Sequence, residues 1–370
     1  MNLFTDPLGM KPTILKKINM SSIIRILMKY QPISRTEIAK KSGISKPTVS
    51  KLVNLLMEED YLIDAGKKES VQGKRQSLLS LNPNKARTIV VDIGLRKTTL
   101  SVVNFAFEIL VMKTFKTIKD LHTFIKQLST EIDQLMKATK TDPEKIVISV
   151  PGTVDSNLRK VYDVPLLGWK NVLLSDLIEL ELDPYDIEAE VLIENDANLG
   201  MTSEVMLNKA IETRNKNIVF ILVKEGIGLG FFINNGFYFG RSHSAGEFGH
   251  MMIDKSSKGK KYWLDLAGSE EMEKFVGKGK VEEYVEILAI GFINVINGLD
   301  PDICVFSGEC CRYWDDIYPI LREKTNKQSK VENPEQLEIT CSAFKNIESP
   351  LLGGAIIGFK DYIELSSLID

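Results

Sequence analysis

The sequence has few cysteines and lacks the long apolar runs of a membrane protein. No window of the 370 residues resembles the run of about 20 apolar residues that spans a bilayer, and the opening MNLFTDPLGMKPTILKK has no apolar core of signal-peptide length. The four cysteines, Cys304, Cys310, Cys311 and Cys341, form neither a CxxC motif nor a disulfide framework. We interpret Cys310 and Cys311 as small residues near a strand end. We therefore expect a soluble, globular protein of the reducing cytoplasm, with no membrane partner.

Positive charge is concentrated in one part of the chain. Residues 1–82 carry 14 lysines and arginines against 7 aspartates and glutamates, whereas the other 288 residues carry 33 against 43. A basic segment on an acidic body indicates that the basic segment meets a polyanion. Surface charge is a weak signal when taken alone, so the segment must also show a binding motif.

Three helices are predicted within the basic segment, the last two joined by a tight turn. Residues 20–30 have the spacing of an amphipathic helix. Ser34-Arg35-Thr36-Glu37 is a capping box, which predicts a helix that begins at Arg35 and ends by Gly43. Ser45 then caps the next helix over residues 46–58, with Pro47 in its first turn. The apolar face of that helix consists of Val49, Leu52, Val53 and Leu56.

This arrangement is the helix-turn-helix plan, with residues 46–58 as the recognition helix. Strands around residues 61–66 and 77–83 flank a wing whose tip, Gly73-Lys74-Arg75, is expected to reach a minor groove. Small hydroxyls and basic side chains are the groups that contact phosphates and base edges. The alternatives are a small helical bundle with a solvated polar face and a winged helix that binds protein. The predicted DNA contacts are Arg35, Ser45, Lys46, Thr48, Ser50, Lys51, Lys74 and Arg75.

The rest of the chain predicts alternating strands and helices, which is typical of an α/β fold. Its strands end in polar or glycine-rich turns at Asp92-Ile93-Gly94, Pro151-Gly152-Thr153, Asn195-Asp196 and Gly226-Ile227-Gly228. Such strand ends place ligands at one edge of an α/β sheet, and glycines there let backbone N–H groups approach phosphate oxygens. Each of these signals is weak on its own.

Together the motifs resemble the ROK family of bacterial repressors and sugar kinases, and the head resembles its xylose-repressor-like branch. SVPGTVD, GWKN, ENDANLG, GIGLG and GEFGH occur in the family's order, and the resemblance covers nearly the whole chain from about residue 20. It implies a winged helix-turn-helix over residues 1–82, a linker at 83–87 and a sugar-binding domain over 88–370. That domain is expected to have two actin- or hexokinase-like (ribonuclease H-like) α/β lobes. The first covers about 88–200 plus the C-terminal helix, and the second covers about 201–350.

The resemblance also implies a sugar site between the lobes. In the family an Asn-Asp pair, the Glu and His of an ExGH motif, and a later acidic residue hold sugar hydroxyls. A glycine in the SVPG turn, here Gly152, lets the backbone approach the ring. The alternative is that the Glu and His only tie down a loop and the Asp only caps a helix. The matching residues are Asn195, Asp196, Glu247, His250 and Asp265.

One departure from the family pattern bears on catalysis. The family's kinases have DxGGT and GTGIG turns around the ATP phosphates, whereas here the turns are Asp92-Ile93-Gly94-Leu95-Arg96 and Lys224-Glu225-Gly226-Ile227-Gly228. Glu225 adds negative charge and a hydroxyl donor is lost, which opposes nucleotide binding. We therefore expect Asp196 to hold a sugar hydroxyl and not to act as a catalytic base.

A second departure concerns the family's zinc loop, CxCGxxGCxE. The matching stretch is SSKGKKYWLDLAGS, in which Ser256, Lys258 and Trp263 replace the three cysteines and Asp265 replaces the acid. These side chains supply no thiolate for a structural zinc, so we expect neither a metal nor a cofactor. We suggest Trp263 as a hydrophobic replacement for the metal.

We predict a sugar-responsive DNA-binding transcriptional repressor of carbohydrate-utilisation genes, and no enzyme. A monosaccharide or sugar phosphate would change lobe closure and re-space two winged helices on double-stranded operator DNA, in a homodimer or a dimer of dimers. Lys224, Arg241 and Lys258 are candidates for a phosphate, although each is more simply a solvated surface charge. Two alternatives stay open: an ATP-dependent hexose kinase with Asp196 as base and a retained DNA-binding head, and a sugar-blind DNA-binding protein. The sugar, the operator and the direction of the switch also stay open.

Overall fold

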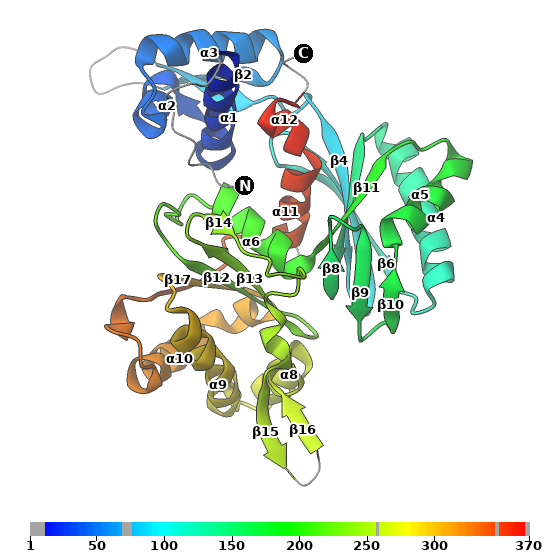
Figure 1. Cartoon of the computed structure of the whole chain (residues 1–370), viewed down its shortest axis with the longest axis vertical. Coiled ribbons are helices and arrows are strands. Elements are labelled where there is room, and N and C mark those ends of the chain that lie inside the picture. The colour runs from blue at the N-terminus through cyan, green and yellow to red at the C-terminus, as the bar shows by residue number, and fades with distance from the viewer. Residues whose placement is uncertain (1–11, 69–75, 257–258, 345–347, 367–370) are drawn as a thin grey trace.

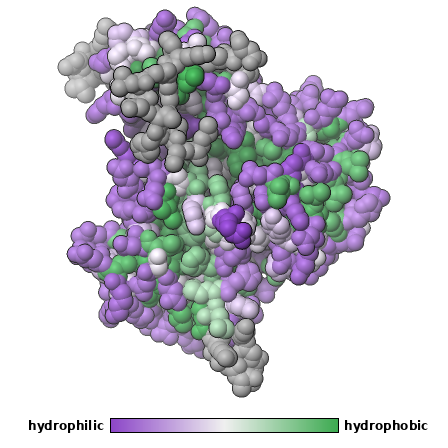
Figure 2. All heavy atoms as spheres, in the orientation of Figure 1, coloured by the Kyte–Doolittle hydropathy of each residue, from purple (hydrophilic) through white to green (hydrophobic). Residues whose placement is uncertain are grey.

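The computed structural model describes residues 12–68, 76–256, 259–344 and 348–366, which form a small N-terminal head and two larger lobes (Figure 1). Hydrophilic side chains cover most of the visible outer surface, and paler or hydrophobic residues gather where the lobes meet (Figure 2). The head consists of α1 (Pro12–Tyr30), β1 (Ile33–Ser34), α2 (Arg35–Ser42), α3 (Lys46–Glu58), β2 (Leu62–Lys68) and β3 (Gln76–Leu81). Its three strands pair in the order β1-β3-β2.

The local signals of the head are confirmed. Ser34 and Glu37 form the capping box of α2, and Gly43 ends that helix in the left-handed region at φ 70°. Ser45 caps α3, with Pro47 in its first turn. The first helix is longer than predicted, because α1 already begins at Pro12. The result is the predicted winged helix-turn-helix.

The first lobe is built on a five-stranded sheet in the order β11-β7-β4-β5-β6. Strands β4, β5 and β6 are antiparallel neighbours, whereas β7 and β11 continue the sheet parallel to β4. Helices α4 and α5 cover one face, and the C-terminal α11 covers the other. The elements are β4 (Arg87–Ile93), β5 (Lys97–Asn104), β6 (Ile109–Lys116), α4 (Leu121–Thr139), β7 (Lys145–Val150), α5 (Leu174–Leu182), β11 (Glu190–Asn195), α11 (Glu348–Gly358) and α12 (Lys360–Glu364). A small sheet of β8 (Thr153–Asp155), β9 (Lys160–Val164) and β10 (Trp169–Val172) and the short helix η1 (Asp183–Tyr185) complete this lobe.

The second lobe repeats this plan with the order β14-β13-β12-β17-β18, again an antiparallel hairpin extended by two parallel strands. Helices α9 and α10 pack on one face of the sheet and α6 packs on the other. The main elements are α6 (Asp196–Leu207), β12 (Ile218–Val223), β13 (Ile227–Ile233), β14 (Gly236–Phe237), α9 (Val281–Leu299), β17 (Ile303–Gly308), α10 (Trp314–Gln328) and β18 (Glu338–Cys341). Between them lie η2 (Glu247–His250), β15 (Met252–Ser256), β16 (Gly259–Tyr262), α7 (Trp263–Ala267), α8 (Ser269–Val276), η3 (Glu309–Tyr313) and η4 (Pro334–Gln336). The architecture confirms the predicted α/β class.

The two lobes meet where α6 packs against α11. The backbones approach so closely that a Cβ on Gly353 of α11 would lie 1.9 Å from the carbonyl oxygen of Leu199 of α6. The hydroxyls of Ser203 and Ser349 are 2.9 Å apart across the same contact. The expected lobe boundary at Gly200 therefore falls inside α6, a helix that both lobes hold.

One interpretation from the sequence is wrong. Cys311, which we took for an unpaired small residue, forms a disulfide with Cys341. Cys311 lies shortly after β17, and Cys341 ends β18. Because these parallel strands are neighbours in the sheet, they bring together cysteines that are 30 residues apart in sequence. Cys304 and Cys310 are free and buried.

The described helices include none that combines the length and the apolar character needed to cross a bilayer.

The α6–α11 contact predicts a specific sensitivity to one methyl group. Gly353→Ala should lower the free energy of unfolding by about 1–3 kcal/mol, because the new Cβ overlaps a backbone oxygen of the facing helix. Urea denaturation measures the difference. The matched control is Gly298→Ala, near the end of α9, where an added Cβ meets nothing within 4 Å and alanine favours the helix. Equal effects of the two substitutions would contradict this packing.

Candidate functional site

A cavity of about 370 Å³ lies between the lobes and is lined from both of them. Its walls are the ends of β7, β11 and β12, the turn after β4, and the loop that carries η2. A pocket of this size accepts a small ligand. Five of the six predicted sugar contacts line this cavity, namely Gly152, Asn195, Asp196, Glu247 and His250.

Two adjacent residues form the floor of the cavity at the start of α6. Asn195 caps this helix: its Oδ1 accepts hydrogen bonds from the backbone N–H groups of Ala197 and Asn198, at 2.9 and 3.1 Å. Its Nδ2 donates to the carbonyl oxygen of Gly152 at 3.0 Å, which fixes the Pro-Gly turn against the helix. The carboxylate of Asp196 follows in the first turn and is only 9% exposed. The sequence therefore places an acceptor group at the positive end of a helix, at the base of the cavity.

Lys224 is the main feature of the site that sequence reasoning missed. Its side chain is 16% exposed, and its Nζ lies 3.0 Å from Asp92 Oδ2 and 3.5 Å from Asp196 Oδ2. Ser149 Oγ donates to the same Asp92 carboxylate at 2.6 Å. Our interpretation of Lys224 as a solvated surface charge is thus wrong, whereas its alternative role as a phosphate ligand stays a prediction. The only signal in the sequence was a lysine in place of the small residue that the family's kinases have directly after this strand.

The three charges perturb one another. Burial raises the pKa of Asp196 to about 6, and the neighbouring negative charge of Asp92 adds to the rise, while Lys224 partly offsets it. Burial would lower the pKa of Lys224, but Asp92 and Asp196 together raise it above its usual value. Lys224 therefore stays charged beside the carboxylates of Asp92 and Asp196.

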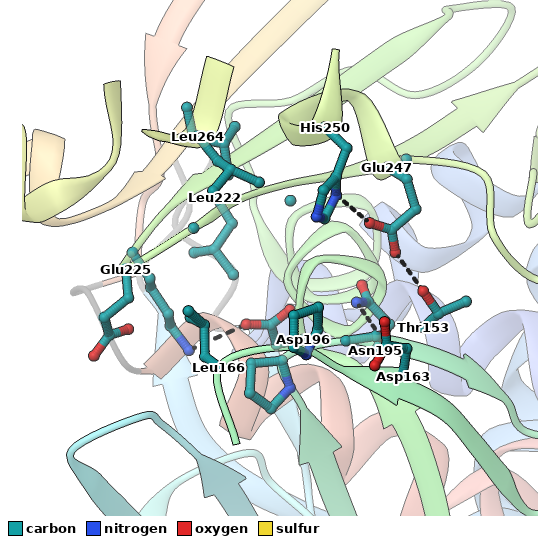
Figure 3. A pocket seen from close by; sticks show the side chains of 18 of the residues that line it. Thr153, Asp163, Leu166, Asn195, Asp196, Leu222, Glu225, Glu247, His250 and Leu264 are labelled. Carbon is teal, nitrogen blue, oxygen red and sulfur yellow. Dashed lines mark hydrogen bonds and ion pairs between the residues drawn. The ribbon is translucent and has the colours of Figure 1, made fainter. Parts of the chain in front are cut away.

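Glu247 and His250 face the cavity from the second lobe, opposite Asp196 (Figure 3). One carboxylate oxygen of Glu247 accepts a hydrogen bond from Thr153 Oγ1 of the first lobe at 2.9 Å, and the other lies 3.2 Å from His250 Nδ1. Both side chains are still 40–50% exposed, so each keeps free hydrogen-bonding capacity. Gly246 sits just before them at φ 104°, where a Cβ would lie 2.1 Å from the carbonyl oxygen of Leu229. The pair is thus held by a loop conformation that requires glycine.

Asp265 is not among the residues that line the cavity. Its carboxylate is exposed and accepts a hydrogen bond from the backbone N–H of Tyr262 at 3.0 Å, as part of the cap of α7. The expectation that Asp265 contacts the sugar came from motif alignment alone, and the structure assigns this residue a capping role instead.

The stretch that aligns with the family's zinc loop contains a buried tryptophan. Trp263 is fully buried in the apolar core of the second lobe, and its indole ring packs against Gly291. Lys258 lies outside the described residues. Within the ranges that the structure describes, no three His, Cys, Asp or Glu side chains are grouped as a metal site requires.

Three of the eight predicted DNA contacts are exposed on the recognition helix α3. Lys46, Thr48 and Lys51 are exposed on α3, Ser50 is half-buried, and Ser45 is the N-cap, with its hydroxyl 2.8 Å from that of Thr48. Lys74 and Arg75 of the wing lie outside the described residues.

Arg35 is occupied within the head. It donates to the carbonyl oxygen of Ser50 at 3.2 Å and to Asn54 Oδ1 at 2.8 Å, so it ties α2 to α3. Arg35 therefore stabilises the arrangement of α2 and α3.

Comparison with known proteins identifies the family. The ROK family profile matches residues 88–262, and a winged helix-turn-helix DNA-binding profile matches residues 19–63. The xylose repressor of Bacillus spizizenii is 30% identical over 306 residues, which cover 78% of this chain and 76% of that protein. The chain belongs to the ROK family.

Solved structures of other ROK proteins share the fold. A ROK family transcriptional regulator, described as a homolog of the Escherichia coli MLC protein, superposes with a TM-score of 0.72 at 18% identity, over 95% of this chain and 98% of that one. A ROK family glucokinase from Streptomyces griseus, solved with glucose and AMPPNP, gives a TM-score of 0.64 at 18% identity, over 74% of this chain and 99% of that one. The regulator is thus similar over head and lobes, whereas the kinase is similar over three quarters of the chain.

The raised pKa of Asp196 predicts how stability depends on pH. This carboxyl binds its proton more tightly in the folded chain than in the unfolded chain. Its stabilising contribution to the free energy of unfolding is therefore complete below pH 4 and is lost as pH rises through about 6. Asp196→Asn keeps the shape and removes that loss, so the variant should be more stable than wild type at pH 8 by up to about 3 kcal/mol. The difference should disappear near pH 4. Urea denaturation across this pH range measures it, and a variant that is less stable at pH 8 would contradict the assignment.

Proposed function

We propose that this ROK protein is a transcriptional repressor of carbohydrate-utilisation genes whose affinity for operator DNA is set by a neutral monosaccharide in the interlobe cavity. The observation that carries the proposal is the position of Lys224. The ammonium group of Lys224 lies against Asp92 and Asp196. The cavity therefore keeps a floor that suits a sugar, whereas the protein's own cation occupies the carboxylate that would act as base and the turn that would bind phosphate in a kinase.

A sugar fits the groups that line the cavity. Carboxylates accept hydrogen bonds from vicinal hydroxyls, and an amide or imidazole both donates and accepts. Asp196 and Asn195 offer such groups from the floor, and Glu247 and His250 offer them from the second lobe. Binding of one ligand by both lobes favours their closure, because only the closed state satisfies all of its hydroxyls.

The charge of the cavity favours a neutral ligand over a sugar phosphate. Asp163, Asp196, Glu225 and Glu247 line it, and Lys224 is the single lysine or arginine among its described lining residues. Since Lys224 already lies between two carboxylates, a phosphate would meet excess negative charge. The relative named a xylose repressor makes xylose the first sugar to test.

The head supplies the DNA-binding side of the proposal. Lys46, Thr48 and Lys51 project from the recognition helix, where they are available to phosphates and base edges. Readers of this type bind paired half-sites as dimers, so we place two copies on a palindromic operator, in the cytoplasm where the DNA lies.

Ligand binding tests the sugar side. Titration calorimetry with xylose, glucose and N-acetylglucosamine should find a neutral sugar that binds, and its phosphorylated form should bind at least about tenfold more weakly. Glu247→Gln should weaken binding of that sugar about tenfold by removing a charged acceptor. The control is Arg241→Gln, an exposed residue outside the cavity lining, which should bind as wild type does. Tighter binding of the phosphate, or no binding of any sugar, would contradict the proposal.

The second candidate function is an ATP-dependent hexose kinase, which the glucokinase fold and the retained Asp196 favour. We expect no phosphoryl transfer from ATP to any sugar of the panel, because Lys224 neutralises the base. A coupled ADP-release assay measures it. Turnover that Asp196→Asn abolishes would instead establish the kinase.

A further inference from the structure

The first helix of the head touches both of the helices that lie beneath it. Helix α1 contacts α6 and α12, besides α2 and α3 of the head itself (Figure 1). Helix α12 continues from α11, which covers the sheet of the first lobe, whereas α6 covers the sheet of the second. The orientation of the head therefore depends on the relative positions of two elements that belong to different lobes.

The α6 side of this joint is a buried lysine. Lys29, in the last turn of α1, is 8% exposed, and its Nζ donates to the carbonyl oxygens of Val205 at 3.2 Å and Ile211 at 2.7 Å. These carbonyls lie at the C-terminal end of α6 and in the loop after it, where the helix dipole favours a cation. Burial lowers the pKa of Lys29, whereas the nearby charges of Glu212 and Glu204 favour its protonated form. A cation this deeply buried fixes the geometry of its partners, because its hydrogen bonds have no solvent substitute.

The polar contact on the α12 side of the joint is weaker than that of Lys29. Arg25 lies 3.9 Å from Glu364, and both side chains are nearly half exposed. An exposed ion pair at this distance contributes little to stability, so its side chains can rearrange at little cost. Of the two polar contacts, Lys29 is thus the one that ties α1 to α6, whereas apolar packing holds α1 on α12.

The other end of α6 is the floor of the cavity. Asn195 and Asp196 begin the helix, and its 12 residues cover about 18 Å to the end that Lys29 holds. Nearly all of its side chains from Asp196 to Val205 are buried, so the helix cannot tilt or shift without moving what it contacts at both ends.

We propose that α6 carries the state of the cavity to the DNA-binding head, and that Lys29 is the positioning residue through which α1 follows it. The inference rests on the proposed function, since it supposes a ligand at Asp196 and an operator at α3. It adds the physical route between them: ligand, first turn of α6, last turn of α6, Lys29, α1 and recognition helix.

The test is a substitution that removes the donor and keeps the apolar stem, Lys29→Met. Operator affinity is measured by fluorescence anisotropy on the full-length protein, with and without saturating xylose or the sugar that calorimetry identifies. Wild type should show at least about a fivefold change in Kd, the lower end of ordinary allosteric coupling. In Lys29→Met the change should fall below twofold, while its sugar affinity without DNA stays within about threefold of wild type.

The matched control is Lys209→Met at the same joint. Lys209 is exposed and donates a single hydrogen bond, to the carbonyl oxygen of Gln31 at 3.1 Å, so its removal should leave the sugar response intact. A Lys29→Met protein that keeps the wild-type response overturns the inference and leaves the proposed function standing. A wild-type protein whose operator affinity no sugar changes overturns both.

A second measurement needs no variant and so does not depend on its folding. Hydrogen exchange of wild type should change on sugar binding in residues 24–30 and 205–211, the two sides of the Lys29 contact. Sugar binding that shows in calorimetry but leaves exchange in both segments unchanged would also overturn the inference.

Discussion

The structure depends on one buried ion group at the junction of its lobes, Lys224 between Asp92 and Asp196. Two carboxylates buried this close would repel each other, and the ammonium group from the end of β12 offsets that repulsion. The three residues come from β4 of the first lobe, from the turn after β12 of the second lobe and from the helix between them, so the ion group joins the two lobes. Under the proposed function, the same ion group leaves no free carboxylate to act as the base for phosphoryl transfer.

The parts around this group are tightly packed, which suits a switch with discrete states. Helix α6 is buried between α11 and the sheet of the second lobe, at a contact that Gly353 makes close enough to exclude a methyl group. The head in turn shares one continuous apolar core with the first lobe, from Ile23 and Leu27 of α1 to Phe105 and Phe359. The head is therefore packed against the body, so a shift of α6 can reach α3 through packed side chains.

The local parts of this fold were predictable, because their causes lie within a few residues in sequence. Ser34 with Glu37, Gly43 and Ser45 specify two helix starts and one helix end by short-range hydrogen bonds, and the structure has all three. The candidate sugar contacts were predicted from motif order, and five of the six line one cavity. Asp265 does not line it, because its carboxylate accepts a hydrogen bond from the backbone N–H of Tyr262, a local contact that the motif order does not predict.

What could not be predicted arises from contacts between segments far apart in sequence. Lys224 meets Asp92 across 132 residues, and Lys29 meets Ile211 across 182. Cys311 and Cys341 are joined only because β17 and β18 are neighbours in the sheet. A single sequence carries no pairing information at these distances. A buried lysine and a surface lysine also look the same in it.

The most direct test of the account is capture of fragmented genomic DNA by the purified full-length protein, with and without xylose, followed by sequencing of the bound fragments. We predict sharp enrichment of a palindromic site beside genes for sugar transport or catabolism, with an occupancy that the sugar changes. A flat profile under both conditions would contradict it, because a head that selects no sequence leaves the cavity and α6 with no operator to control.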